Sequence, residues 1–239
     1  MGFRITRKQV ENERLMSSEI IYSDTILFRD EDTWIKYPQY RIWHNKLWLA
    51  DQLGYTCGPC GIFVPKDDYY IVRPTINISG YGINAKIVYI KSNEYFSAPT
   101  GYFWSERFQG DHCSFDYVRK NNRWVQVSCW QGIKSDENNL YKWKKWNVSK
   151  HKLELPSLFD TLDVPNLNVE AIGNKIIEVH LREGNYNEEG WTETLCYWEG
   201  DDMDHESLIK DNYIFVEPEA EYSRGIEMLP EKLLGYYVR

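Results

Sequence analysis

The sequence lacks the long apolar runs and the excess of positive charge that mark two large classes of protein. No apolar segment in its 239 residues approaches the roughly 20 residues of a membrane-spanning helix. Lys and Arg total 28 against 36 Asp and Glu, so the formal net charge is -8 at pH 7. A field of that sign repels phosphate backbones and anionic lipid. We therefore expect no membrane association, and we expect nucleic acid to bind only through a local basic patch.

Cysteine is also scarce. The chain has five cysteines, an odd number, and they are scattered along it. A secreted disulfide framework is typically built from an even, regularly spaced set, so we expect reduced cysteines. The first fifteen residues contain Arg4, Arg7 and Arg14 among lysine and acidic residues, without the apolar core of a signal peptide. These features predict a cytoplasmic protein.

Aromatic residues are abundant, at 15% of the chain, and 42% of all residues are hydrophobic. That composition predicts a folded protein whose core needs neither metal nor disulfides, arranged as one compact domain or two small lobes. A charged, mildly amphipathic segment over 3–22 predicts a surface helix. Apolar residues at helical spacing predict a second helix over 40–53, which Gly54 would end.

Beyond residue 54 the apolar period shortens to two, as it does in strands. The expected elements are strands over 69–74 and 83–90, a hairpin of 113–118 with 123–130, a helix over 153–164, and a hairpin of 167–172 with 176–181. Asn121, Asn122 and Gly173 stand at the turns, where a left-handed backbone is needed. Strands that alternate with helices and are joined by hairpins predict an α+β fold.

Four short segments carry the side chains with the clearest chemistry. A helix bears Lys46, and a strand ends Val72-Arg73-Pro74 before a loop that contains glycines. Glu106-Arg107-Phe108-Gln109-Gly110 then leads into the first hairpin, and Glu170 faces the strand over 177–182 across a turn. In this order the segments resemble the ATP-grasp superfamily, whose helix opens with Asp-Lys, whose strand ends Val-Lys-Pro, and whose last metal-binding strand reads Glu-Val-Asn-x-Arg. The resemblance covers roughly residues 40–185.

The resemblance implies an ATP-grasp fold, with two α+β lobes whose antiparallel sheets enclose a nucleotide cleft. The expected division is a flanking segment over 1–39, a first lobe with the glycine-rich loop over 40–103, and a second lobe over 104–239. Most of the N-terminal domain that precedes the grasp in larger members would be absent. The chain would then depend on a partner protein or on residues 191–239 to hold its second substrate.

The activity that the resemblance implies is that of an ATP-dependent ligase. A carboxylate would attack the γ-phosphate of ATP, and an amine or a thiol would capture the resulting acyl-phosphate. Such a reaction depends on cations and backbone N–H groups that stabilise charge on phosphoryl oxygens. The implied cofactors are ATP and Mg²⁺, with Mn²⁺ as a substitute, and Arg73 and Arg182 are the residues expected to act on the reacting groups.

By the same resemblance the nucleotide would be held by cations, a loop and the segment between the lobes. The expected residues are Lys46, Arg73, Ser79, Gly80, Gly82, Glu106, Phe108 and His112. Glycines leave room for a loop to fold its amides over phosphates. Arg73 stands where the superfamily has lysine, which keeps the charge and adds a bidentate fork.

Glu170, Glu178 and His180 are the metal ligands that the resemblance implies. Mg²⁺ prefers hard oxygen ligands, and two carboxylates of one hairpin can share a face of the sheet. His180 takes the place of the superfamily's asparagine. Because imidazole is a softer donor, the choice of metal stays open.

Two other classes of function remain as alternatives. A nucleotide-binding protein without ligase activity would suit His180 and the absent domain. A structural or nucleic-acid-binding protein would suit the tract Tyr141-Lys-Trp-Lys-Lys-Trp146, which interleaves cations with aromatic rings. We favour a surface loop for this tract, with its tryptophans covering the core.

Cys57-Gly-Pro-Cys60 resembles the redox site of thioredoxins in its four residues alone. In thioredoxins the motif opens a helix that lowers the pKa of the thiol, whereas here it follows a predicted helix and opens none. We therefore predict a tight loop, with an adventitious disulfide or zinc site as the lesser alternative.

Overall fold

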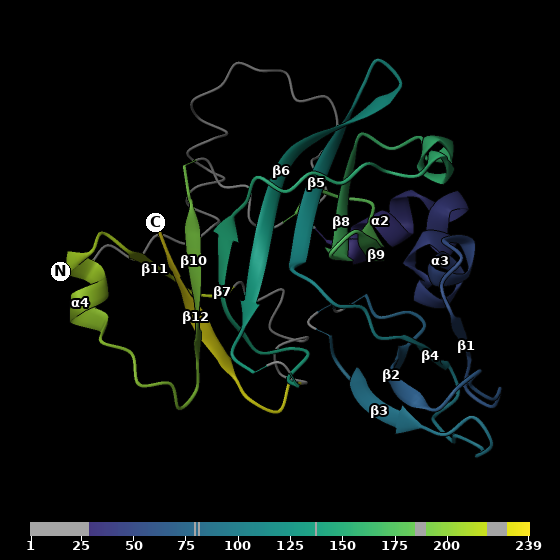
Figure 1. The fold of residues 1–239 in the computed structure, drawn as a ribbon. Coiled ribbons are helices and arrows are strands. Elements are labelled where there is room, and N and C mark those ends of the chain that lie inside the picture. The colour runs from purple at the N-terminus through teal and green to yellow at the C-terminus, as the bar shows by residue number, and fades with distance from the viewer. Residues whose placement is uncertain (1–28, 79, 81, 137, 185–189, 219–228) are drawn as a thin grey trace.

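The computed structural model describes residues 29–78, 80, 82–136, 138–184, 190–218 and 229–239 (Figure 1). The helix expected over 3–22 and the loop residue Ser79 lie outside these ranges. Within them, no helix is both long and apolar enough to cross a membrane.

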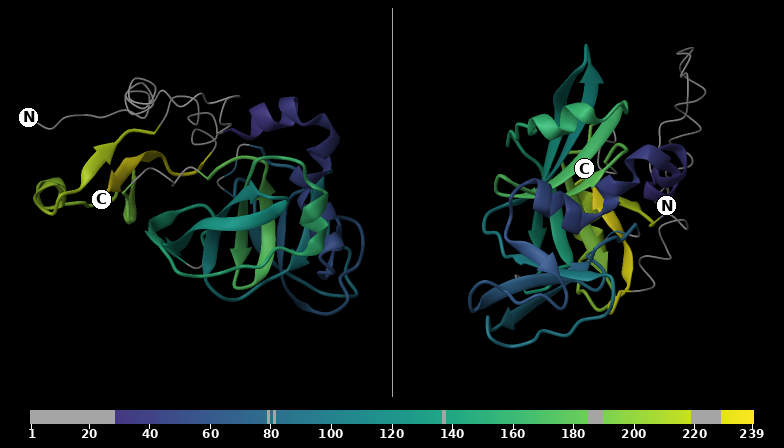
Figure 2. Two further views of the ribbon diagram at one scale, coloured as in Figure 1. Left: turned by 90° about the horizontal axis from the view of Figure 1, so that it is seen from above. Right: turned by 90° about the vertical axis from the view of Figure 1, so that its right-hand side faces the viewer.

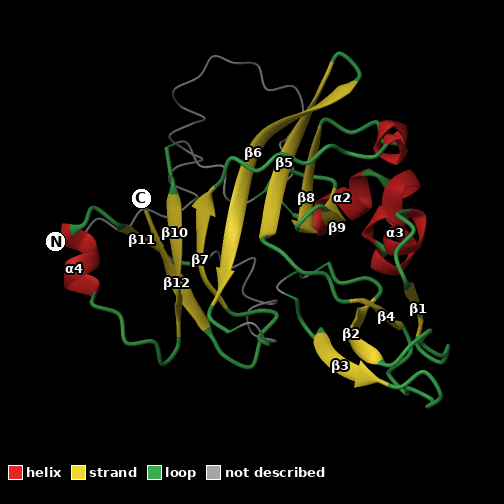
Figure 3. Ribbon diagram, in the orientation of Figure 1, coloured by secondary structure: helices red, strands yellow, loops and turns green. Residues whose placement is uncertain are grey.

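Two antiparallel sheets form the body of the molecule (Figures 1 and 3). The smaller sheet has the order β1-β4-β2-β3, with β1 (Cys57–Pro59), β2 (Asp68–Pro74), β3 (Lys86–Ile90) and β4 (Tyr102–Glu106). The larger has the order β11-β12-β10-β7-β6-β5-β8-β9, with β5 (His112–Lys120), β6 (Arg123–Lys134), β7 (Trp143–Val148), β8 (Asn166–Ile172), β9 (Lys175–His180), β10 (Glu193–Trp198), β11 (Ile214–Val216) and β12 (Leu233–Val238). The expected α+β class with antiparallel sheets is confirmed.

The helices gather at two ends of the molecule (Figures 1 and 2). At one end lie α2 (Asp30–Lys36), the 3-10 helix η1 (Pro38–His44) and α3 (Lys46–Gln52), with η1 and α3 against β9. At the other end lies α4 (His205–Lys210). The predicted division at 103/104 stays a prediction, although β4 pairs with β1 and β2 in the smaller sheet.

The single helix expected over 40–53 is wrong, because Asn45 interrupts it. The backbone of Asn45 is extended, with φ -87° and ψ 103°, and its side chain accepts a hydrogen bond from the backbone N–H of Trp48 at 3.0 Å. That bond makes Asn45 the N-cap of α3, since asparagine competes well for a free N–H at a helix start. The break decides where Lys46 stands, namely at the first position of a new helix.

Two further expectations need correction. The strand over 83–90 starts only at Lys86, because Asn84 has φ 63° in a turn. The helix expected over 153–164 is only the short 3-10 helix η2 (Ser157–Thr161). The chain before it is extended. The hydroxyl of Tyr117 donates to the carbonyl of Leu153 at 2.5 Å, and Pro156 keeps the chain extended up to the first turn.

The two segments expected to be loops are strands. Tyr141 to Trp146 leads into β7, and Trp146 and Trp143 help to form a core cluster as expected. Cys57 to Cys60 begins with β1, in which Cys57 pairs with Ser105. Gly58 lies so close to Trp104 that an added Cβ would be 2.7 Å from its ring. That packing holds the motif against the sheet edge.

Both predicted hairpins are confirmed. Asn121 and Asn122 have φ 49° and 59° in the β5–β6 turn, and Gly173 has φ 59° between β8 and β9. Successive side chains of β5 point to opposite faces of the sheet. Cys113, Phe115 and Tyr117 therefore point into the main core, while His112 lines a cavity. One strand therefore serves two environments.

We expect Phe159→Ala to lower the free energy of unfolding by roughly 3–5 kcal/mol, because the ring is fully buried at the centre of the main core. It meets Trp43 edge-on with ring centroids 4.9 Å apart. Urea unfolding measures the change. Ile209→Ala, at a side chain 60% exposed on α4, is the control and should alter stability by about 0.5 kcal/mol or less. Equal losses in both variants would contradict the assigned core.

Candidate functional site

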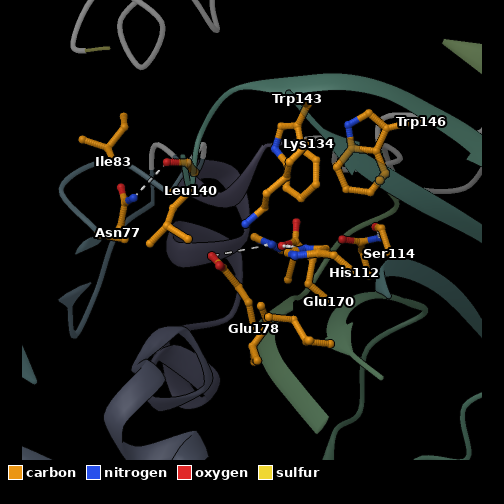
Figure 4. A pocket seen from close by; sticks show the side chains of 18 of the residues that line it. Asn77, Ile83, His112, Ser114, Lys134, Leu140, Trp143, Trp146, Glu170 and Glu178 are labelled. Atoms are coloured by element: carbon orange, nitrogen blue, oxygen red, sulfur yellow. Dashed lines mark hydrogen bonds and ion pairs between the residues drawn. The ribbon is translucent and has the colours of Figure 1, made fainter. Parts of the chain in front are cut away.

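A cavity of about 1100 Å³ lies between the smaller and the larger sheet. Its wall takes residues from β2, β3 and β4 on one side and from β5 to β10 and β12 on the other. Figure 4 shows its centre, where Lys134, Glu170 and Glu178 point toward one another beside His112 and Trp143. All of the predicted site residues that the structure describes line this cavity.

Lys46 reaches the cavity from the start of α3. Its backbone N–H donates to the carbonyl of Thr75 at 2.7 Å, which fixes the helix start against the end of β2. Its Nζ lies 2.8 Å from Oε1 of Glu178, and the lysine side chain is only 7% exposed. The helix start at Asn45 and the hydrogen bond to Thr75 together place the ammonium group of Lys46 against the carboxylate of Glu178.

Arg73 enters the cavity from the end of β2. One Nη atom donates to the carbonyl of Ile177 at 3.1 Å, and the guanidinium lies over the ring of Phe103. Burial lowers the pKa of Arg73, and the charges of Glu178 and Glu170 offset part of that effect. Its buried Nε has no hydrogen-bond partner among the residues that the structure describes. A buried donor left unsatisfied costs about 1–3 kcal/mol, so an acceptor brought by a ligand would be stabilised here.

Glu170 and Glu178 lie directly opposite each other in the β8–β9 ladder. Paired residues share a face, so both carboxylates border the cavity. Nε2 of His112 lies 3.1 Å from Oε2 of Glu170. Burial alone would raise the pKa of Glu170, but the hydrogen bond and charge of His112 outweigh it and lower the pKa to about 2. Glu170 is therefore charged, and both glutamates lie close to cationic or basic side chains.

His180 and Arg182 turn toward a residue that the sequence reasoning missed. Nδ1 of His180 lies 2.8 Å from Oδ2 of Asp30, and Nε of Arg182 lies 3.1 Å from Oδ1 of the same carboxylate. The other nitrogen of His180 is 3.7 Å from Oε1 of Glu178. Asp30 precedes His180 by 150 positions, so no local motif could have pointed to it.

The charges of this trio stabilise one another. Burial alone would raise the pKa of Asp30, yet the charges of Arg182 and His180 hold it well below its usual range. Burial alone would lower the pKa of His180, yet the carboxylate of Asp30 raises it above the ordinary value. Asp30 thus holds Nδ1 of the imidazole, and Nε2 is the nitrogen that faces Glu178.

The expected nucleotide-binding residues that the structure describes line the cavity, and some of them already have partners within the protein. Oε1 of Glu106 accepts from the backbone N–H of Thr56 at 2.9 Å, so its carboxylate secures β1. Phe108 packs edge-on against Tyr55. Gly80 and Gly82 have φ 70° and 60°, which suits glycine.

The sequence reasoning also missed one cation and the aromatic wall beside it. Lys134 lies with its Nζ 5.1 Å from the ring centre of Trp143, and burial lowers its pKa. Trp143 and Trp146 pack against Gly132, where an added Cβ would be 2.6 Å from Trp143. Strict alternation counted from Trp124, which packs against the main core, would have put Lys134 on that same face. The bulge in β6 opposite Asp116 and Tyr117 shifts the register, so Lys134 lines the cavity instead.

The three expected metal ligands do not converge fully. In the described part of the chain, Glu170, Glu178 and His180 do not bring three ligand atoms within 4.8 Å of one another. The two carboxylates have the hard oxygens that Mg²⁺ takes, with phosphates and water to complete its shell. The pair fits such an ion, and the role of His180 as a third ligand stays a prediction.

No protein-family model matches the sequence, and no curated protein matches it. Several solved structures are similar over part of the chain, and three of them illustrate the range of similarity. They are a protein assigned to the ATP-grasp superfamily from Archaeoglobus fulgidus (15% identity, TM-score 0.39, 60% of this chain and 46% of that one), an L-amino acid ligase from Bacillus licheniformis (10%, 0.44, 60% and 41%), and an N5-carboxyaminoimidazole synthase from Aspergillus clavatus in complex with ADP and 5-aminoimidazole ribonucleotide (11%, 0.42, 88% and 67%).

The first of these structures is assigned to the superfamily that the sequence motifs resemble. The chain spans less than half the length of the first two proteins. With TM-scores below 0.5 throughout, the reaction has to be inferred from the cavity itself.

We expect Asp30→Asn to lower the pKa of His180 from above its ordinary value to below it, because burial and Arg182 then act without the opposing carboxylate. A histidine with a raised folded pKa adds stability that is complete below about pH 6.5 and declines as the pH rises through the folded value. NMR titration of the imidazole measures the shift. Asp32→Asn, on the same helix but paired with Arg29, is the matched control. An unchanged His180 titration in Asp30→Asn would show that the pairing is wrong.

Proposed function

We propose that the chain is an ATP-grasp-type ligase, which uses ATP and Mg²⁺ to activate a carboxylate for capture by an amine or a thiol. The observation that carries the proposal is the convergence of Lys46, Arg73 and Lys134 with Glu170 and Glu178 on one cavity between two sheets. These cations come from α3, β2 and β6, far apart in the sequence.

The arrangement suits a triphosphate. Three buried or half-buried cations can neutralise phosphoryl oxygens in a cavity lined by protein, where electrostatic interactions are stronger than in bulk water. The unsatisfied Nε of Arg73 offers a donor that an oxygen would complete. The cavity volume of about 1100 Å³ matches the upper end of small-molecule sites, which leaves room for a nucleotide and a second substrate.

Glu170 and Glu178 are the proposed holders of the metal. When bound, Mg²⁺ would neutralise charge on the phosphates that it shares with these carboxylates. Lys46, now paired with Glu178, would face the phosphates beside that ion. His180 takes a positioning role in this proposal, since it links Asp30 to Glu178 and so holds the second carboxylate in place.

The reaction would proceed in two displacements. A substrate carboxylate oxygen attacks the γ-phosphorus, an O–P bond forms, and the bond to ADP breaks. The amine or thiol then attacks the acyl carbon, and inorganic phosphate leaves with loss of one proton to solvent. Arg73 would bind the transferred phosphoryl group, and Arg182, which Asp30 orients, would bind the acidic substrate at the cavity wall.

Residues of the C-terminal segment support the expected role in holding the second substrate. Trp191, Thr194 and Trp198 line the cavity together with Leu233 and Tyr236. Ile83, which follows Gly82 in the glycine-containing loop, belongs to the same hydrophobic cluster as Trp198 and Leu233. A partner protein that replaces an absent domain stays a prediction.

We expect Arg73→Gln and Glu178→Gln each to reduce ADP formation by about 10²- to 10³-fold, the typical effect of removing one preorganised charge contact. ADP release, measured with a panel of amino acids and other carboxylates plus amines, tests this. Lys175→Gln, on β9 but outside the cavity wall, is the matched control and should keep full turnover. Undiminished turnover in Arg73→Gln and Glu178→Gln would refute the assignment.

Thermal shift separates the alternative functions at low cost. A ligand that binds only the folded chain stabilises it, by about 2.7 kcal/mol when the ligand concentration is a hundred times Kd. The melting temperature rises accordingly. A shift with ATP and Mg²⁺ but no ADP formed on any substrate would favour a nucleotide-binding protein without ligase activity. No shift with ATP would favour a structural or nucleic-acid-binding protein.

A further inference from the structure

A second cluster of reactive side chains lies on the other face of the large sheet. Cys113 on β5 and Cys129 on β6 point into the main core, away from the cavity that His112 lines. His151, which follows β7, stands over them. Sγ of both cysteines and one nitrogen of the histidine all lie within 4.8 Å of one another.

We propose that Cys113, Cys129 and His151 bind a single Zn²⁺ ion, at a site separate from the nucleotide cavity. Sγ of Cys113 lies 3.6 Å from Nδ1 of His151. Ligands of a tetrahedral zinc ion, with Zn–S and Zn–N bonds of about 2.3 and 2.1 Å, stand about 3.6 Å apart as sulfur and nitrogen. The two donor atoms already have the separation that one ion between them requires.

The histidine is held over the thiols by the chain that carries it. The backbone N–H of Ser149 donates to the carbonyl of Cys129 at 2.8 Å. The side chain of Gln126 donates to the carbonyl of His151 at 2.8 Å and accepts from the N–H of Leu153 at 3.1 Å. These bonds fasten residues 149–153 along β6, so the imidazole needs little ordering before it binds a metal.

Asp111 is placed to accept a hydrogen bond from the ring nitrogen of His151 that does not bind the metal, as is usual for zinc-bound histidines. Its Oδ2 lies 3.5 Å from Nε2 of His151, on the side of the ring away from the thiols. A carboxylate there favours a proton on Nε2 and leaves the lone pair of Nδ1 for the metal. The hydroxyl of Ser149, 2.7 Å from Nδ1, would give way to the ion.

Charge and softness select zinc over magnesium. Two thiolates and a neutral imidazole balance a divalent cation, and a neutral site suits thiols that are 2% and 3% exposed. Sulfur donors favour Zn²⁺ strongly over hard ions. His151 is 48% exposed on its side chain, so a water molecule can reach the fourth position.

Metal content of the purified full-length chain tests the proposal. After growth with zinc and purification under reducing conditions without chelator, we expect close to one Zn²⁺ per chain. His151→Gln and Cys129→Ser should lose it, with affinity reduced at least about a hundredfold in a competition with a chromophoric chelator. Asp111→Asn should weaken binding about ten- to a hundredfold if it orients the imidazole.

Matched controls keep the test specific. Cys57→Ser and Cys60→Ser remove the other cysteine pair, and Glu170→Gln alters the nucleotide cavity, yet all three should retain full zinc. Cobalt(II) in place of zinc should give thiolate charge-transfer bands and the visible absorption of a tetrahedral ion, which His151→Gln loses. Because His151 is partly exposed, its replacement leaves the core thiols in place and the fold intact.

Three results would overturn the site. They are less than a tenth of an equivalent of zinc in the unaltered chain, unchanged zinc affinity in His151→Gln, or a Cys113–Cys129 disulfide that forms in air in place of metal binding. None of these depends on ATP turnover, so the zinc site and the proposed ligase activity stand or fall separately.

Discussion

A charged side chain that is buried needs a partner of opposite charge. This requirement determines how the charged side chains between the two sheets are arranged. Lys46 meets Glu178 at 2.8 Å, and Asp30 holds both His180 and Arg182. Breaking such a buried pair by removing one partner is costly, because the remaining charge is left uncompensated. The pairs therefore tie α2 and α3 to β9, and they keep the cations and carboxylates in place for a charged ligand.

The two faces of the large sheet serve different chemistry because side chains alternate along a strand. His112 points to the cavity between the sheets, while Cys113, its neighbour, points to the core and to the proposed zinc site. The proposed phosphate-binding site, with its hard oxygen ligands, and the proposed zinc site, with its soft sulfur ligands, can thus share one strand without sharing ligands.

Local patterns were sufficient for several parts of the fold. The turns at Asn121, Asn122 and Gly173 require a left-handed backbone that few residues adopt, so both hairpins could be predicted. Helix limits were not predictable in the same way. Asn45 caps a new helix because its side chain reaches the N–H of Trp48, and Tyr117 holds an extended segment through Leu153. Each depends on one specific hydrogen bond that periodicity does not record.

The sequence alone determined the α+β class, the order of the charged segments, and that Lys46 and Arg73 come early while Glu170 and Glu178 come late. Only the tertiary structure decided that Asp30 takes up His180 and Arg182, and that Lys134 joins the cavity. The reason is physical: a charge takes whichever partner the folded chain brings within a few ångströms, and sequence separation does not limit that choice.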